Sequence, residues 1–206
     1  MPDGLLADLP AMEVEGRIDR LRPALAGAGC DALLVTSLVN IRYLTGFTGS
    51  AGLLLVREDD LLFVSDGRYA QQAADQLVAS GVDARIEISG TGQRELLRTG
   101  AEGVARLGLE AGAVTWAQQR RYDDDWFPAA DLVATEGLVE ALRIVKDEGE
   151  VARIEAAARI ADAALAEVRH LLLEGPTESE FGLALDTAIR RLGAEGTSFE
   201  TIVASG

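Results

Sequence analysis

Two short segments of the chain carry side chains that a simple connection between elements does not need. Residues 40–50 read Asn-Ile-Arg-Tyr-Leu-Thr-Gly-Phe-Thr-Gly-Ser, and residues 66–69 read Asp-Gly-Arg-Tyr. They place aromatic rings, hydroxyls and arginines between apolar runs, where polar turn residues would be sufficient. We therefore predict a functional loop here, or at least a loop whose conformation is closely specified.

Two interpretations of these segments remain open from the residues alone. Gly46, Gly49 and Gly52 do not have the spacing of a phosphate-binding loop, and no lysine follows them. They either belong to a loop that faces a substrate or let the backbone enter a closely packed strand. Arg42 and Arg68, each beside a tyrosine, are either available to a ligand or held in internal ion pairs.

Conventional catalytic and metal-binding groups are scarce. His170 is the one histidine, and no Gly-x-Ser-x-Gly segment occurs, so a Ser-His-Asp or His-based metal site is not expected. Three consecutive carboxylates at residues 123–125 would point in three directions on a helix, which predicts a solvated helix end. We expect Trp116, Trp126 and Phe127 to lie in the core or an interface.

Hydrophobic periodicity predicts an alternation of helices and strands in the first two thirds of the chain. Positions such as Val14, Ile18, Leu21 and Leu25 recur three or four residues apart, and short apolar runs follow. The pattern predicts an α/β fold with a mixed sheet flanked by helices. The expected helices span residues 14–28, 68–79, 92–99 and 115–124, and the expected strands span 31–36, 52–56, 61–64, 84–88, 104–109 and 132–134.

The pattern changes after residue 137. Residues 151–172 predict one long helix with its apolar stripe at Ile154, Ala158, Ala161, Leu165, Val168 and Leu172. A capping box at residues 177–180 opens a second helix, and residues 199–204 resemble the start of a strand. We place a domain boundary between residues 142 and 143, which gives a first domain at 1–142 and an unfinished second domain at 143–206.

The overall composition limits the classes of function. The net charge is −15, which disfavours nucleic acid and anionic membrane surfaces as partners. Met1 to Met12 lacks the basic region of a secretory signal, and a single cysteine, Cys30, cannot form a disulfide framework. We therefore expect a cytoplasmic protein with Cys30 as a small buried apolar residue.

The two segments at 40–50 and 66–69, the apolar run at 52–56 and the residues 142–150 together resemble the creatinase/prolidase family, most closely its Xaa-Pro aminopeptidases and dipeptidases. Residues 198–206, Ser-Phe-Glu-Thr-Ile-Val-Ala-Ser-Gly, resemble the first inner strand of the family's catalytic domain. The resemblance covers the chain from about Arg17 onward. It implies a creatinase-type amino-terminal domain followed by the start of a "pita-bread" metallopeptidase domain.

The resemblance also implies a chemistry. In the family, two Asp, one His and two Glu hold two divalent ions, commonly Mn²⁺, Co²⁺ or Zn²⁺, and a bridging hydroxide attacks the bond before proline. Those ligands follow the Ser-Gly pair that is last here, so no catalytic or metal-binding residue can be carried over. We expect the 206-residue chain to bind no metal and to be inactive alone.

What the resemblance implies for this chain is a role in substrate access and assembly. Family members form homodimers, and the amino-terminal domain of one subunit partly covers the site of the other, which restricts it to short proline-containing peptides. Asn40, Tyr43, Phe47 and Arg68 are the candidate residues near that entrance. Tyr43 and Phe47, four residues apart, would share one face of a short helix. Alternatively, these two rings pack the loop onto its own sheet.

Two other functions remain open. The chain could be a non-catalytic interaction module whose acidic surface binds a basic partner, or part of a creatine-type amidinohydrolase on the same scaffold. The sequence does not separate aminopeptidase from dipeptidase.

Overall fold

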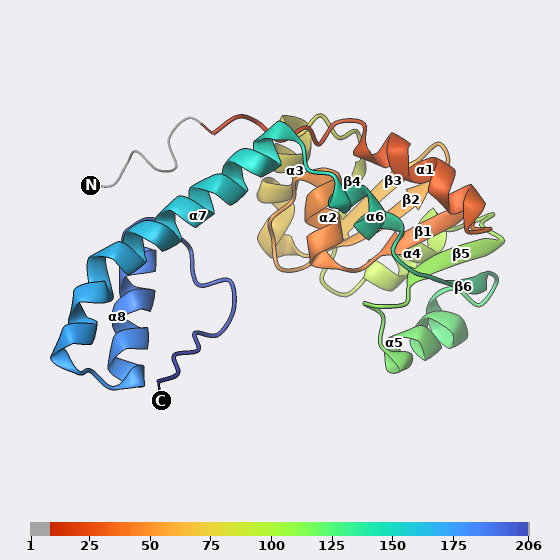
Figure 1. The fold of residues 1–206 in the computed structure, drawn as a ribbon. Coiled ribbons are helices and arrows are strands. Elements are labelled where there is room, and N and C mark those ends of the chain that lie inside the picture. The colour runs from red at the N-terminus through yellow and green to blue at the C-terminus, as the bar shows by residue number, and fades with distance from the viewer. Residues whose placement is uncertain (1–8, 206) are drawn as a thin grey trace. The chain divides into compact units, whose positions relative to one another are not determined.

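A computed structural model describes residues 9–205, and these form two compact units (Figure 1). One unit spans Glu13–Val145, and the other contains Lys146 onward together with the residues before Glu13. The predicted boundary between residues 142 and 143 falls within a helix of the first unit and stays a prediction. Most of the segment considered for a secretory signal, and Gly206, lie outside the described residues. No helix of the described part is long and apolar enough to cross a membrane.

The first unit is built on a six-stranded mixed sheet with the order β4-β3-β2-β1-β5-β6. β2 runs antiparallel to both of its neighbours, while the pairs β1/β5, β5/β6 and β3/β4 are parallel. β2 and β3 form a hairpin. The strands span β1 Ala32–Val35, β2 Leu53–Arg57, β3 Leu61–Ser65, β4 Arg85–Ile88, β5 Arg106–Glu110 and β6 Asp131–Thr135.

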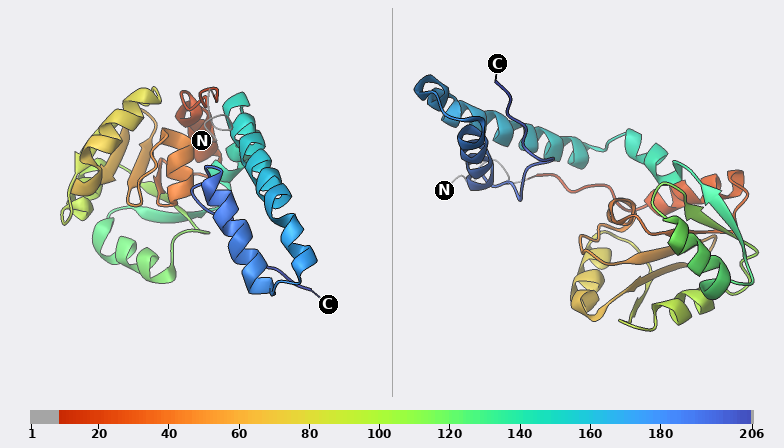
Figure 2. Two further views of the ribbon diagram at one scale, coloured as in Figure 1. Left: turned by 90° about the vertical axis from the view of Figure 1, so that its left-hand side faces the viewer. Right: turned by 90° about the horizontal axis from the view of Figure 1, so that it is seen from below.

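Helices cover both faces of this sheet, as Figures 1 and 2 show. Four of them contribute side chains to the core on one face: α1 Arg17–Gly27, α2 Leu38–Thr45, α3 Ala70–Ala79 and α6 Leu138–Ile144. The opposite face is covered by α4 Gln93–Gly100 and by the segment in which α5 Trp116–Arg121 continues into a π-helical turn, Tyr122–Trp126. The predicted α/β architecture is confirmed.

The apolar run in β1 shows how the sequence forms two cores. Successive strand residues point to opposite faces, so Leu33 and Val35 enter one hydrophobic cluster while Ala32 and Leu34 enter the other. All four are fully buried. A strand covered on both faces needs apolar residues at every position, which is why β1 reads as a continuous run.

The second unit contains α7 Glu148–Val168, a 3₁₀ segment at Arg169–Glu174 and α8 Glu178–Arg191. Capping boxes open both α-helices, at Asp147 with Glu150 and at Thr177 with Glu180. The two helices lie side by side, with Ala164, Val168, Phe181 and Ala188 buried between them. Residues 146–205 contain no β-strand.

Three expectations for this region were wrong. The buried face of α7 carries Ala156, Ile160, Ala164 and Val168, so Ile154 and Leu165 of the predicted stripe are exposed. The α-helix ends at Val168 and does not continue to Leu172. Residues 199–204 form no strand: the Thr201 hydroxyl bonds to Asp186 of α8, and the Ser205 backbone N–H donates to Glu178 of the same helix.

Two aromatic predictions had different outcomes. Trp126 packs against a core and Phe127 is buried in it, both beside Tyr122, as expected. Trp116, predicted in a core or an interface, is 75% exposed at the start of α5, so it does not lie in the core of this unit. Cys30 is buried, as expected, and burial raises the pKa of its thiol.

Candidate functional site

The reversed direction of β2 brings the two predicted segments to one edge of the sheet. β1 and β3 run in the same direction, so the chain leaves both strands at the same edge, and it enters β2 there as well. Residues 36–52 follow β1, and residues 66–69 follow β3. The carboxyl ends of β5 and β6 lie at this edge too, because both are parallel to β1.

The first segment folds as helix α2 followed by a turn, and its aromatic residues face inward. Gly46 ends α2 with a left-handed backbone, φ 74°, which a residue with a side chain adopts only with strain. Phe47 therefore lies beyond the helix, and the expectation that Tyr43 and Phe47 share one helical face was wrong. Phe47 is buried against Phe63 and Tyr69, with ring centroids 4.8 and 5.6 Å away.

Asn40 is fully buried and joins two carboxylates. Its amide nitrogen donates to Glu110 Oε1 at 2.7 Å and to Glu140 Oε1 at 2.6 Å. Its amide oxygen accepts a hydrogen bond from Arg143 Nη1 at 3.0 Å. The side chain of Asn40 thus connects α2 with the end of β5 and with α6.

Glu110 has a second role at the start of α2. Its Oε2 accepts hydrogen bonds from the backbone N–H groups of Thr36 and Ser37, at 2.6 and 2.8 Å. A carboxylate at this position satisfies N–H groups that have no partner within the helix and interacts favourably with the helix dipole. Glu110 is therefore a structural acceptor whose oxygens are already occupied.

Tyr43 contacts α1 and α6. The guanidinium of Arg17 lies 4.0 Å from the centre of the Tyr43 ring, and Arg17 Nη1 donates to the Tyr43 carbonyl at 2.7 Å. The Tyr43 hydroxyl donates to the Leu142 carbonyl at 3.1 Å. Both side chains are buried, so this cation–π contact is protected from water.

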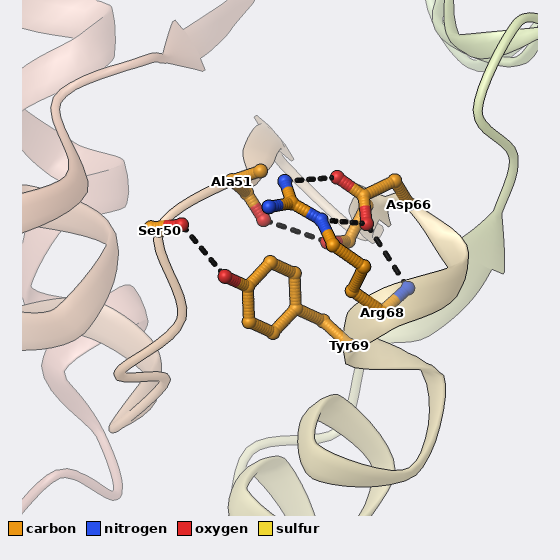
Figure 3. Close-up of polar contacts among 6 residues, drawn as sticks. Ser50, Ala51, Asp66, Arg68 and Tyr69 are labelled. Atoms are coloured by element: carbon orange, nitrogen blue, oxygen red, sulfur yellow. Dashed lines mark hydrogen bonds and ion pairs between the residues drawn. The ribbon is translucent and has the colours of Figure 1, made fainter.

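The second segment forms a polar cluster at the surface, which we call the Arg68 cluster: Ser50, Asp66, Arg68 and Tyr69 (Figure 3). Asp66 receives hydrogen bonds from Arg68 Nε at 3.0 Å and Nη2 at 2.8 Å, and also from the Arg68 backbone N–H. Ser50 Oγ and the Tyr69 hydroxyl lie 2.6 Å apart. The Arg68 side chain is 66% exposed, and its guanidinium lies 5.0 Å from the centre of the Tyr69 ring.

These contacts change the pKa values of three groups in the Arg68 cluster. The hydrogen bonds from Arg68 lower the pKa of Asp66, and the same pairing raises the pKa of Arg68. The hydrogen bond with Ser50 lowers the pKa of Tyr69. The cluster therefore presents a fixed guanidinium, with its Nη1 directed away from Asp66, and an ionisable phenol at the same edge of the sheet.

The glycines favour the packing interpretation of the first segment. A side chain on Gly49 would overlap the rings of Phe47 and Tyr69, and one on Gly52 would crowd Phe63. Thr48, directly before Gly49, is held by Gln72 and Gln76 of α3, through its hydroxyl and its backbone N–H. The loop is thus closely specified by its neighbours.

The structure separates the four predicted site residues. Asn40, Tyr43 and Phe47 are buried, while Arg68 is exposed, and Phe47 and Arg68 both contact Tyr69. Arg42 is also exposed. Glu110 and Glu140 were not predicted from the sequence. Glu110 could have been recognised, because it is a carboxylate at the end of the apolar strand 106–110. Residues 9–205 contain no group of three or more His, Cys, Asp or Glu side chains arranged to hold a metal ion.

Comparison with known families assigns both parts of the chain. Residues 17–145 match the Creatinase/Prolidase N-terminal domain. The chain belongs to the creatinase/prolidase family. Residues 152–206 match Metallopeptidase family M24, which agrees with the resemblance seen in the sequence.

Curated relatives in this family extend beyond the present chain. An uncharacterized peptidase, YqhT, from Bacillus subtilis is 35% identical over 92% of this chain and 53% of its own length. A Xaa-Pro dipeptidase from Pyrococcus horikoshii is 26% identical over 85% of this chain and 48% of its own, and a creatinase from a Bacillus species is 30% identical over 83% and 43%. The chain thus spans about half the length of the curated relatives it matches.

Solved structures of this family share the fold. The Xaa-Pro dipeptidase from Bacillus anthracis has a TM-score of 0.81 and 31% identity, over 90% of this chain and 51% of that one. The N-terminal domain of the cytoplasmic peptidase PepQ from Mycobacterium tuberculosis has a TM-score of 0.55 and 36% identity, over 62% of this chain and 98% of that one. The second match concerns a structure that contains the first unit alone.

Proposed function

We propose that this chain forms the amino-terminal half of a metal-dependent peptidase that hydrolyses Xaa-Pro bonds in short peptides. The observation that carries the proposal is the order of the two family matches in one chain, with the creatinase/prolidase domain followed by the M24 segment. A Xaa-Pro dipeptidase is similar to the chain across both parts. We further propose a cytoplasmic location, which suits a protein with one buried thiol, Cys30.

Two divalent ions would supply the chemistry in the complete protein, by activating water and polarising the scissile carbonyl. Their ligands would come from the part of the M24 domain that this chain does not match. The described residues instead form the support: a six-stranded sheet, covered by helices on both faces, that holds the Arg68 cluster and α2 at one edge. The first unit would contribute to dimerisation and to substrate access.

Arg68 is the best candidate for substrate access. It is the exposed member of the four predicted residues, and Asp66 and Tyr69 hold its guanidinium in one orientation. A fixed guanidinium binds carboxylates well, since less side-chain freedom is lost on binding. Asn40, Tyr43 and Phe47 would act from the interior by holding the edge in place.

The coding DNA after codon 206 provides the first test. We expect an open frame of about the length that the relatives have beyond this chain, encoding Asp, His and Glu ligands for two metals. The extended protein should hydrolyse Xaa-Pro dipeptides or Xaa-Pro-Xaa tripeptides with Mn²⁺, Co²⁺ or Zn²⁺, and the 206-residue chain should not. Metal-dependent turnover by the 206-residue chain, or an extended protein that spares Xaa-Pro bonds, contradicts the proposal.

Two variants of the extended protein test the role of Arg68. Arg68→Ala should raise KM for Xaa-Pro peptides with little change in kcat, whereas Arg42→Ala, which removes an exposed arginine of α2, should leave both unchanged. Equal effects of the two substitutions would exclude a specific role. Light scattering at several protein concentrations tests the expected homodimer.

A creatine-type amidinohydrolase is the second candidate, because a creatinase is 30% identical to this chain over 83% of its residues. Creatine hydrolysis by the extended protein, with no cleavage of Xaa-Pro peptides, would select it. An in-frame stop directly after codon 206 would instead favour a stand-alone interaction module.

A further inference from the structure

Helix α6 is weakly held by apolar contacts. It has seven residues, which is too short to be stable as an isolated helix. Val139 is its one fully buried side chain, while Leu138 and Leu142 are partly buried. Ile144 and the adjoining Val145 are 74% and 78% exposed. Gly137 precedes the helix without a side-chain cap.

Polar contacts from α2 compensate for this weak packing. Asn40 donates to Glu140 and accepts from Arg143, and the Tyr43 hydroxyl donates to the Leu142 carbonyl. These contacts reach positions in both turns of α6. We call this set of residues the α6 clamp: Asn40, Tyr43, Glu140, Leu142 and Arg143.

The two sides of the clamp differ in how firmly they are anchored. α2 buries Ile41 and Leu44 completely, and Glu110 ties its first turn to β5. Glu140, in contrast, is exposed on α6. If the clamp opens, α6 therefore moves and α2 stays with the sheet, because local opening follows the element with the smaller buried area.

We propose that α6 is a releasable strap, and that Asn40 and Tyr43 hold it against the sheet. Since α6 is the last helix before the chain passes to the M24 segment, the residues after β1 control the freedom of that connection. The proposal assigns a positioning role to two residues that the sequence suggested for substrate access. It does not depend on the reaction that the complete protein catalyses.

The test combines Tyr43→Phe with Glu140→Ala in the 206-residue chain. Tyr43→Phe removes one hydroxyl and keeps the ring on Arg17, and Glu140→Ala removes an exposed acceptor, so neither change opens a large cavity. Amide hydrogen exchange in residues 138–145 should become about tenfold faster, because the lost hydrogen bonds stabilise the closed form by only a few RT. Exchange in β1, β2 and β3 should stay unchanged.

Trypsin cleavage after Arg143 gives a second measurement, since this bond lies inside α6 and is protected while the helix is closed. Cleavage there should accelerate by about the same factor as amide exchange. Tyr69→Phe is the matched control, because it removes a tyrosine hydroxyl that bonds Ser50 and has no contact with α6. Unchanged exchange in 138–145, or an equal loss of protection in α6 and the sheet, overturns the proposal.

Discussion

The two units of this chain differ in how completely they bury their apolar side chains. In the first unit, helices cover both faces of the sheet, and each strand residue of β1 is buried. In the second unit, α7 and α8 bury one small cluster, but these helices and the 3₁₀ segment between them expose other apolar residues: Val151, Ile154, Leu165, Leu172, Leu173 and Leu183. The first unit has an enclosed core, and the second has apolar surface that its described residues, 9–12 and 146–205, do not cover.

This difference shows which part of the chain can be treated as a folding domain. A domain needs a core that its own elements enclose, and the six-stranded sheet of the first unit satisfies this condition. The structure of an isolated N-terminal domain of PepQ agrees, since 98% of it matches this unit. Each of the following predictions tests whether the two units differ in the expected way.

The largest effect is expected for Phe47→Ala in the first unit. Phe47 is buried between the rings of Phe63 and Tyr69, so its removal leaves a cavity in a core that cannot collapse easily. The free energy of unfolding of this unit should fall by about 3–5 kcal/mol, measured by urea unfolding. Phe199→Ala is the control, because Phe199 is exposed and its loss should have almost no effect.

A smaller loss is expected for Phe181→Ala in the second unit. Phe181 belongs to the cluster between α7 and α8, where few neighbours enclose it. We expect a loss of about 2 kcal/mol, below the range for a phenylalanine in a closed core. Hydrogen exchange should show the loss in α7 and α8 while the sheet remains protected. If Phe181→Ala lowered the free energy of unfolding as much as Phe47→Ala, the core of the second unit would be enclosed as well.

The exposed face of α7 provides the third prediction. Ile154→Gln should change the free energy of unfolding by no more than about 0.5 kcal/mol, because the side chain is already in water. Ile160→Gln on the buried face of the same helix should be strongly destabilising. Ile154→Gln should also reduce self-association, measured by sedimentation. Equal destabilisation by both variants would show that residue 154 is covered in solution.

Two tyrosines of the first unit extend the comparison to polar groups. Burial raises the pKa of Tyr122, whereas the hydrogen bond with Ser50 lowers that of Tyr69. Ser50→Ala should therefore raise the pKa of Tyr69 toward its ordinary value of about 10 and leave Tyr122 unchanged. Absorbance at 295 nm against pH, with Tyr69→Phe to assign the transition, measures both. If the pKa of Tyr69 were the same in Ser50→Ala as in the wild type, Ser50 would not bond Tyr69 in solution.

The smallest effect concerns Asp66. Pairing with Arg68 lowers its pKa, so the unfolded chain holds this proton more tightly than the folded chain. The resulting stabilisation is fully present above the ordinary Asp pKa of about 3.9 and disappears as pH falls through the lowered value. The stability difference between wild type and Asp66→Asn should therefore shrink in acid. A difference that stayed constant as the pH falls would show that Arg68 does not lower the pKa of Asp66.

All six strands of the first unit and the helices α1, α3, α4 and α5 could be predicted, because local pattern and burial agree there, whereas α2 was predicted as a loop. The runs at 32–35 and 53–56 are apolar at every position, which occurs in strands covered on both faces. Helix α6 was missed because Gly137 starts it without a polar cap and Val139 is its one fully buried residue. Its stability comes from Asn40 and Tyr43, about 100 residues away in sequence, which no local pattern reveals.

The alanine-rich helix α7 shows a different limit. Apolar residues occur on more than one of its faces, so the three- and four-residue spacing fits both Ile154 with Leu165 and Ile160 with Ala164. Only the position of Phe181 on α8 selects the second face. The predicted site had the same difficulty. The aromatic and polar residue types identified the segments 40–50 and 66–69, but they did not indicate that Phe47 packs inward while Arg68 points to solvent.

The reversal of β2 also determines where the protein can be labelled. The turn between β2 and β3 lies at the edge of the sheet opposite the Arg68 cluster and α2, and Asp59 within it is exposed. The native thiol, Cys30, is buried, and its raised pKa makes it a poor nucleophile. An Asp59→Cys variant should therefore accept a single fluorophore at the edge of the sheet opposite the Arg68 cluster, where the label does not obstruct binding assays of that cluster.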